Sequence, residues 1–231
     1  MSAPRAGIIL QARFASQRLP GKALASIAGR PILEHCLLRL LASESAPVVL
    51  ATTAGPEDDA LAEVASGIGV PVFRGDSADV LGRYVSCAAH FRFDLVIRAT
   101  GDNPGVDIDA PARILAGLQY TDADYVREDG LPYGAAVEGV RADALAQAAM
   151  LAGEPSDREH VTTFIRRRTD LFRVLEQVAP AAVRRPDVRL TVDTADDLLL
   201  VQHLYRQARV EMPSLVDLIA ASDQMPRQSV A

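Results

Sequence analysis

Short apolar runs alternate with amphipathic segments through the first half of this chain. An apolar run is typical of a strand buried on both faces, and such runs occupy residues 6–10, 47–53, 70–73 and 93–99. Apolar residues at helical spacing follow each run and predict helices over 31–41, 56–66, 79–91 and 109–118. This alternation predicts an α/β fold, in which a mostly parallel mixed sheet lies between two layers of helices.

The pattern is less regular in the second half. We expect strands at 124–127, 135–140, 172–178 and 188–192, and helices at 142–151, 156–168, 193–207 and 214–221. Polar residues at helix starts predict side-chain caps: Ser77 or Asp79, Ser156 or Asp157, and Thr194 with Asp197 in a variant of the capping box. The sequence has no internal repeat and no low-complexity linker, which favours one domain over residues 1–231 with a polar tail at 223–231.

The loop between the first strand and the first helix, residues 10–24, carries candidate chemistry. It contains three cations, a hydroxyl donor and a glycine that lets the backbone approach a ligand closely: Arg13, Arg18, Lys22, Ser16 and Gly21. No Asp or Glu precedes Glu34, so the cations have no local partner. Loops between a strand and a helix bind phosphorylated ligands in α/β proteins. The cations of this loop predict a binding site for an anion of high charge, such as a triphosphate.

Lys22 is the only lysine among the 24 Lys and Arg residues of the chain. Arg offers a planar fork, whereas Lys offers a compact point charge that fits between phosphate oxygens. A lone lysine can also survive by chance on a solvated loop. Its place inside an acid-free cationic cluster favours the phosphate-binding interpretation.

Two carboxylates follow predicted strands, Asp102 in R-A-T-G-D-N-P and Asp193 in R-L-T-V-D-T. In open sheets, residues at strand ends often face a ligand crevice. Each could instead have a structural role, Asp102 in its own turn and Asp193 at the start of the next helix. Beside a cationic loop, the pair suits a nucleoside triphosphate with Mg²⁺, which takes one or two carboxylates plus phosphate oxygens.

Residues 11–22, Q-A-R-F-A-S-Q-R-L-P-G-K, resemble the N-terminal signature of the cytidylyltransferases, which include the acylneuraminate and 3-deoxy-manno-octulosonate (KDO) enzymes. The likeness is greatest to the spore-coat polysaccharide biosynthesis protein F family. It continues through Asp102, residues 158–162 and Asp193, over about residues 6–205. The resemblance implies a Rossmann-like, GT-A-like nucleotidyltransferase fold, with a nucleotide-binding half at about 6–105 and an acceptor-binding half at about 106–210.

The resemblance also implies an activity, the Mg²⁺-dependent transfer of CMP from CTP to a small acidic acceptor for surface polysaccharide. Pyrophosphate is the leaving group. The family pattern assigns the metal to Asp102 and Asp193, and phosphate contacts to Lys22, Arg13 and Arg18. The acceptor is a sugar acid or a metabolite bearing a phosphate or phosphonate, and the sequence leaves this choice open.

Residues that hold cytosine in similar enzymes are backbone groups of the first loop and residues after the second and third strands. The corresponding positions here are Gln11, Ala12, Ala51, Thr52, Thr53 and Arg74. Arg74 could equally be a solvated loop charge.

The acceptor side departs from the family pattern. Related proteins tend to have G-x-D-x-E, whereas Gly134–Glu138 reads G-A-A-V-E, with Ala136 in place of the acid. Glu138 remains available for a polar acceptor, and the loss of the acid suits an acceptor that carries its own negative charge. His160 lies in R-E-H-V-T and could contact the acceptor or a phosphate, although a lone histidine is more often structural.

Two other functions stay open. A glycosyltransferase usually places its metal on D-x-D, and Asp107–Asp109 is a triplet of that kind. A non-catalytic nucleotide-binding module should have lost at least one of Lys22, Asp102 and Asp193.

Composition bears on the binding partners and the cell compartment that we expect. The net charge of −6 argues against a nucleic-acid surface, and no apolar run is long enough to cross a membrane. Cys36 and Cys87 fall in apolar, helix-like contexts, so we expect buried free thiols and a cytoplasmic protein. Arg166–Arg168 should end a helix rather than form a basic patch. A homodimer is a further expectation.

Overall fold

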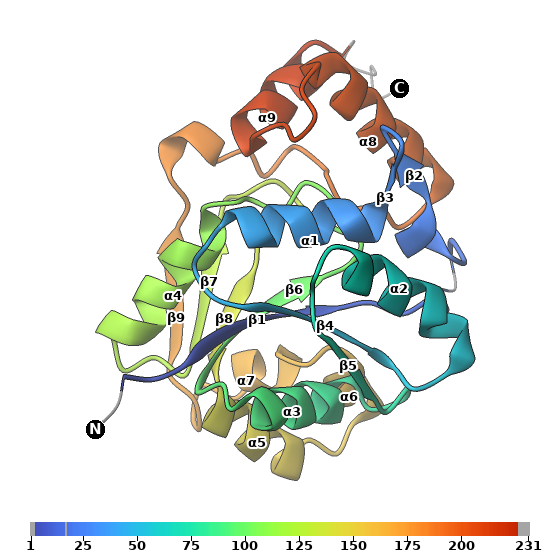
Figure 1. The fold of residues 1–231 in the computed structure, drawn as a ribbon. Helices are drawn as coiled ribbons and strands as arrows, with labels where there is room; N and C mark the ends of the chain where they lie inside the picture. Colours follow the sequence, from blue (N-terminus) through green and yellow to red (C-terminus); the bar gives the residue numbers. More distant parts are fainter. Residues whose placement is uncertain (1–2, 17, 226–231) are drawn as a thin grey trace.

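In the computed structural model, which describes residues 3–16 and 18–225, the chain forms a seven-stranded sheet in the order β5-β4-β1-β6-β8-β7-β9 (Figure 1). The strands are β1 (Ala6–Gln11), β4 (Val48–Thr53), β5 (Val72–Gly75), β6 (Leu95–Thr100), β7 (Tyr125–Asp129), β8 (Glu138–Arg141) and β9 (Val174–Val178). β8 pairs antiparallel with both of its neighbours, and the other pairings are parallel. The predicted mixed and mostly parallel sheet is confirmed.

Helices cover both faces of the sheet, as the alternation of strands and helices predicted (Figure 1). One face carries α1 (Ile32–Ala42), α2 (Asp59–Gly67), α4 (Ala110–Tyr120), α8 (Ala195–Ala208) and α9 (Leu215–Asp223). The opposite face carries α3 (Val80–Phe91), α5 (Ala142–Leu151), α6 (Pro155–Glu159) and α7 (Thr163–Arg167). The three-layer α/β/α architecture is therefore confirmed.

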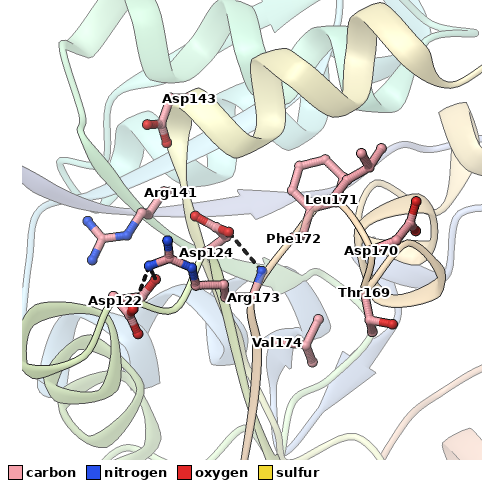
Figure 2. A pocket seen from close by; sticks show the side chains of 10 residues that line it. All are labelled: Asp122, Asp124, Arg141, Asp143, Thr169, Asp170, Leu171, Phe172, Arg173 and Val174. Atoms are coloured by element: carbon pink, nitrogen blue, oxygen red, sulfur yellow. Dashed lines mark hydrogen bonds and ion pairs between the residues drawn. The ribbon is translucent and has the colours of Figure 1, made fainter.

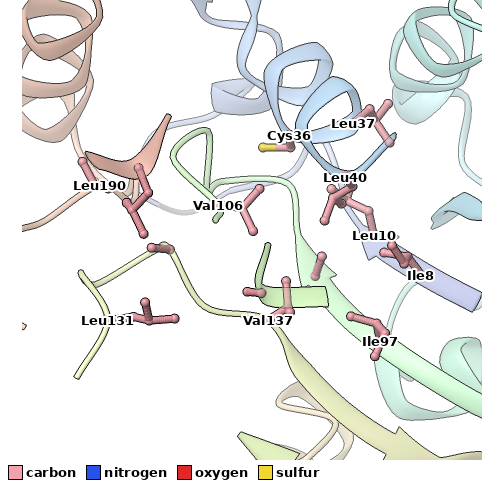
Figure 3. Packing of buried hydrophobic residues seen from close by; sticks show 14 of the residues in the cluster. Ile8, Leu10, Cys36, Leu37, Leu40, Ile97, Val106, Leu131, Val137 and Leu190 are labelled. Carbon is pink, nitrogen blue, oxygen red and sulfur yellow. The ribbon is translucent and has the colours of Figure 1, made fainter. Parts of the chain in front are cut away.

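Each face of the sheet has its own apolar core. Side chains alternate along β1, so Ile8 and Leu10 enter the core beneath α1, whereas Ile9 enters the core beneath α3. Figure 3 shows the first core, where Leu10, Leu37 and Val106 gather between the sheet and α1. Truncating a fully buried leucine such as Leu10 to alanine should cost about 2–5 kcal/mol of unfolding free energy.

Several local predictions are confirmed. The Asp79 carboxylate accepts from the Gly82 amide at the start of α3, so Asp79 rather than Ser77 is the cap. Thr194 and Asp197 form the capping box of α8. Cys36 and Cys87 are buried free thiols, and burial raises the pKa of the Cys87 thiol to about 12.

The single helix predicted over 156–168 is wrong, because the chain forms α6 and α7 with a turn between them. Val161, in this turn, has a φ of 54° and is fully buried, so tertiary packing overrides helix continuation. The predicted caps are wrong too, because Ser156 and Asp157 lie inside α6, whose N-cap is Glu154. Arg167 ends α7, as expected for the basic block.

The strand predicted at 188–192 is also wrong. This segment makes one isolated bridge, between Arg189 and Tyr133. Its amides have acceptors outside the sheet, because the Leu190 amide donates to the Tyr133 carbonyl and the Val192 amide to the Asp102 carbonyl. The segment therefore carries Asp193 to the sheet end without joining the sheet.

The sequence analysis did not predict several short elements. A two-stranded hairpin joins β2 (Ser26–Ile27) to β3 (Arg30–Pro31), and the 3₁₀ helices are η1 (Lys22–Leu24), η2 (Pro56–Asp58) and η3 (Ala181–Val183). Asp223 ends α9 instead of starting a polar tail, and residues 226–231 of the predicted tail lie outside the described residues.

Candidate active site

A cavity of about 1110 Å³ opens at the carboxyl ends of β1 and β6. The predicted residues that line it are Gln11, Ala12, Arg13, Ser16, Arg18, Lys22, Asp102, Gly134, Glu138, His160 and Asp193, together with Ala136. The loop after the first strand, the loop after β6 and the segment before α8 thus meet at one sheet end.

A second cavity, of about 730 Å³, lies at the opposite end of the sheet, near the starts of β7 and β9 (Figure 2). Its charges are engaged locally, because Arg173 pairs with Asp122 and the Arg173 amide donates to Asp124. It contains none of the predicted site residues, so we place the candidate active site in the larger cavity.

Lys22 lines the larger cavity and contacts both predicted carboxylates. Its ammonium donates to three oxygens, Asp102 Oδ2 at 2.8 Å, Asp193 Oδ1 at 3.0 Å and the Val192 carbonyl at 2.9 Å. These three acceptors match the three donors of an ammonium group. Gly21 precedes it with a φ of 70°, a conformation that favours glycine, and so directs the chain into η1.

Three cations surround Asp193. Lys22 and Arg18 contact Oδ1, and Arg18 lies 2.9 Å away, whereas Arg189 contacts Oδ2 at 3.1 Å. Arg189 also donates to both oxygens of Asp197, and this hydrogen bonding holds the pKa of Asp197 well below its usual range. Asp193 is therefore held at both oxygens.

The remaining cation of the first loop, Arg13, pairs with Glu159, the residue before His160. The loop cations thus do have carboxylate partners, but these partners, Asp102, Glu159 and Asp193, are distant in the sequence. Sequence distance hid them, since Arg13 and Glu159 are 146 residues apart.

Glu138 lines the acceptor-side wall and is already engaged. Its carboxylate accepts from Arg98 at 2.5 Å, from Thr162 at 3.1 Å and from the Tyr125 hydroxyl. Burial raises the pKa of Glu138, but the Arg98 charge and these hydrogen bonds outweigh burial and hold the pKa below its usual value. A ligand that used Glu138 would have to join or replace one of these contacts.

The predicted residues after the second and third strands, and Gly21, lie outside the described lining of the cavity. The hydroxyls of Thr52 and Thr53 both donate to the buried carboxylate of Asp58, at 2.8 and 2.6 Å, and Ala51 is fully buried beside them. Arg74 pairs with Asp59 at 2.6 Å.

Sequence reasoning missed Asp58. Its carboxylate also accepts from the Phe14 amide at 2.6 Å, so Asp58 ties the end of β4 to the first loop. Burial raises the pKa of Asp58, but hydrogen bonds from Thr53, Phe14 and Thr52 outweigh burial and lower it. Nothing in the local sequence marks this acid among its neighbours Glu57 and Asp59.

Sequence reasoning also missed Arg83, Arg98, Arg189 and Tyr133. Arg98 had a usable signal, because a charge inside the apolar run 93–99 needs a buried partner. Arg83 is almost fully buried, lines the cavity and donates to the Asp76 carbonyl at 2.6 Å.

The D-x-D triplet at 107–109 is placed differently from a metal site. Asp107 pairs with Arg113 at 2.6 Å and is buried. Within residues 3–16 and 18–225, no group of three or more His, Cys, Asp or Glu side chains is arranged to hold a metal. A metal ion at Asp102 and Asp193 would therefore need further oxygens from its ligand or from water.

Over the part of the chain that the structure describes, none of the helices combines the length and apolar character needed to span a membrane.

Comparisons with known proteins identify the family of this chain. A family model described as cytidylyltransferase matches residues 7–218. The chain is 34% identical over 221 residues to the uncharacterized protein MJ1063 of Methanocaldococcus jannaschii, covering 94% of this chain and 91% of that protein. It is 34% identical over 206 residues to the spore coat polysaccharide biosynthesis protein SpsF of Bacillus subtilis, covering 87% and 86%.

A solved structure supports the same grouping. The cytidylyltransferase of Leptospira borgpetersenii superposes with a TM-score of 0.91 at 28% identity, covering 99% of this chain and 100% of that one. The predicted resemblance to the spore-coat polysaccharide biosynthesis protein F family and the nucleotidyltransferase fold are both confirmed.

Proposed function

The chain belongs to the cytidylyltransferase family, and we propose that it transfers CMP from CTP to a small acidic acceptor with release of pyrophosphate. The acceptor class we propose is a sugar acid or a metabolite bearing a phosphate or phosphonate. One relative is named for spore coat polysaccharide biosynthesis, which supports a role in surface polysaccharide.

One observation carries the proposal, the Lys22 ammonium held between Asp102 and Asp193 at the end of the sheet. This arrangement brings together a point charge suited to phosphate oxygens and two carboxylates suited to a hard cation. Arg13 and Arg18 line the same cavity and add two more positive charges.

Arg13 and Arg18 could exchange their present carboxylate partners for the phosphates of a bound nucleotide at small free-energy cost. The Arg13–Glu159 pair is exposed on both sides, whereas in the Arg18–Asp193 pair the Arg18 side chain is 65% exposed and Asp193 is buried. An exposed ion pair such as Arg13–Glu159 contributes only about 0–1 kcal/mol. The triphosphate would replace the carboxylate partners of Arg13 and Arg18 by phosphate oxygens and would gain a contact with the half-buried Lys22 as well.

The carboxylates fit a divalent cation. Both lie within 3.0 Å of the single Lys22 Nζ, so one small cation can reach both. We propose that Mg²⁺ is held by Asp102 and Asp193, with its other oxygens supplied by phosphates and water. When bound, Mg²⁺ supplies charge that stabilises the phosphates during transfer.

The chemical step is an in-line displacement. An acceptor oxygen forms a bond to the α-phosphorus of CTP, and the bond to the bridging oxygen breaks with pyrophosphate as the leaving group. The protein orients both partners and neutralises charge through Lys22, Arg13 and Arg18. An acceptor phosphate or phosphonate needs no base, whereas a hydroxyl must also lose its proton.

The acceptor would lie against β8 and the turn after α6. Glu138, Gly134 and His160 line that wall, and Ala136 adds no carboxylate there. A negatively charged acceptor therefore meets one fewer repulsive group than in the family pattern. For cytosine, we propose backbone groups of Gln11 and Ala12 at the end of β1. Base contacts from Ala51, Thr52, Thr53 and Arg74 stay a prediction.

Nucleotide-dependent stabilisation tests the base and the phosphate site together. Thermal unfolding is followed with Mg²⁺ and saturating CTP, UTP, ATP or GTP. A ligand at a hundred times its dissociation constant adds about 2.7 kcal/mol to the free energy of unfolding. We expect CTP to raise the melting temperature most, and Lys22→Met to reduce the shift with every nucleotide. Equal shifts with all four nucleotides would contradict the cytosine assignment.

A further inference from the structure

Arg189 contacts Asp193 at the oxygen that Lys22 and Arg18 do not contact. Its Nη2 lies 3.1 Å from Asp193 Oδ2, and the same guanidinium binds Asp197 at 2.6 and 3.2 Å. Its central carbon lies 4.9 Å from the centroid of the Tyr133 ring, and the two residues form a backbone bridge. The guanidinium is thus fixed by two carboxylates and an aromatic face.

The two oxygens of Asp193 have different surroundings. Oδ1 is contacted by Lys22 and Arg18, which line the cavity, whereas Oδ2 is contacted by Arg189. Asp193 and Tyr133 belong to the described residues that line the cavity, and Arg189 lies outside that set. A metal ion entering the cavity would therefore compete with Lys22 and Arg18 for Oδ1 and leave the Arg189 contact in place.

We infer that Arg189 is a positioning residue, which orients the Asp193 carboxylate so that Oδ1 alone faces the cation of a bound metal–nucleotide complex. This inference rests on the proposed function. Partners behind a metal-binding carboxylate commonly set its orientation, and their loss typically lowers metal affinity 10- to 100-fold.

A purely structural role for Arg189 makes a different prediction. Its other partner, Asp197, also accepts from the amides of Asp193 and Thr194 at 3.0 and 2.9 Å. These bonds belong to the cap of α8 and do not require Arg189. We therefore expect α8 to stay capped when Arg189 is replaced, so that the effect on metal binding can be measured in a folded protein.

The experiment compares CTP affinity with and without metal. The dissociation constant of CTP is measured by calorimetry in EDTA and in saturating Mn²⁺, for the wild type, Arg189→Gln and Arg189→Lys. Arg168→Gln is the matched control, because Arg168 makes a two-bond pair with Asp170 at 2.6 and 2.8 Å outside the described lining of the cavity. Thermal unfolding of each variant is measured alongside.

We expect Mn²⁺ to tighten CTP binding in the wild type and in Arg168→Gln. In Arg189→Gln, affinity in EDTA should stay within about twofold, while the enhancement by Mn²⁺ should fall about tenfold. Arg189→Lys should also lose enhancement, because an ammonium lacks the planar fork that spans Asp193 and Asp197.

Three results would overturn the inference. The first is equal Mn²⁺ enhancement in Arg189→Gln and the wild type. The second is a parallel loss of affinity in EDTA and in Mn²⁺ with a lower melting temperature, which indicates a structural role. The third is full rescue by Arg189→Lys, which indicates charge rather than orientation. A wild type that binds no CTP under either condition would contradict the proposed function itself, and with it this inference.

Discussion

Lys22 and Asp193 are 171 residues apart in the sequence, yet Lys22 Nζ lies 3.0 Å from Asp193 Oδ1. The same ammonium lies 2.8 Å from Asp102 Oδ2, so the protein's own cation lies between the carboxylates proposed to hold a metal. The Lys22 side chain is only 14% exposed, which makes this arrangement less screened than a surface pair. Nucleotide phosphates would have to draw Lys22 away before a metal can contact both carboxylates.

Replacing Lys22 by methionine should therefore create a metal site that needs no nucleotide. The two carboxylates would lose their shared cation, and free Mn²⁺ should bind about tenfold more tightly, equivalent to roughly 1.4 kcal/mol. Electron paramagnetic resonance of Mn²⁺ measures this without any acceptor. The double variant Lys22→Met/Asp193→Asn is the control and should bind no better than the wild type. Equal Mn²⁺ affinity in Lys22→Met and the wild type would show that Lys22 does not exclude the metal.

Asp102→Asn and Asp193→Asn should each reduce the rate of pyrophosphate release from CTP at least a hundredfold. The loss of one group that stabilises charge in the transition state typically raises the activation free energy by about 2.7–4 kcal/mol. A carboxamide keeps the size of the side chain but loses most of the metal affinity. Circular dichroism should show a folded protein in both cases. Asp109→Asn is the matched control, because Asp109 belongs to the D-x-D triplet and should be dispensable. A loss of turnover in Asp109→Asn alone would favour the glycosyltransferase-like metal site.

Asp58 should stabilise the fold in a pH-dependent way. Its pKa is lowered in the folded state, so its contribution is present above the unfolded pKa of about 3.9 and is lost as pH falls through the folded pKa. Replacing the fully buried carboxylate by Asp58→Asn should lower the free energy of unfolding at pH 7 by about 1–3 kcal/mol.

Urea unfolding of the wild type and Asp58→Asn at several pH values measures this contribution. The difference between the two should shrink as pH falls below about 4. Asp59→Asn, the exposed neighbour, should show a much smaller difference at every pH. A constant difference for Asp58→Asn across the whole range would mean that the carboxylate charge is not what anchors the first loop.

Periodicity was sufficient for the main elements, because burial on both faces leaves an unmistakable apolar run and helices repeat every three to four residues. It failed where distant partners decide the backbone. Residues 188–192 have the composition of a strand, but their amides bind the loop carbonyls of Tyr133 and Asp102. Val161 interrupts a helical pattern because its side chain is buried in the core beneath α3.

In the candidate site, too, local sequence predicts the residues but not their distant contacts. Lys22, Asp102 and Asp193 could be selected by residue type, by their places after predicted strands and by family resemblance. Their mutual contact could not, since local pattern carries no information on residues 171 positions apart. Arg189 and Asp58 act through other residues rather than at the cavity surface, so neither motif nor charge count distinguishes them.

Acylation of Lys22 tests the central claim, that this lysine lies in the triphosphate site of a CTP-using enzyme, most directly. The sole lysine and the N-terminal α-amino group are the amines available to an acylating reagent, and mass spectrometry reads each one separately. We predict that CTP with Mg²⁺ slows Lys22 labelling at lower concentration than UTP with Mg²⁺, while the α-amino group labels at an unchanged rate. Equal labelling of Lys22 with and without saturating CTP and Mg²⁺ would contradict the account.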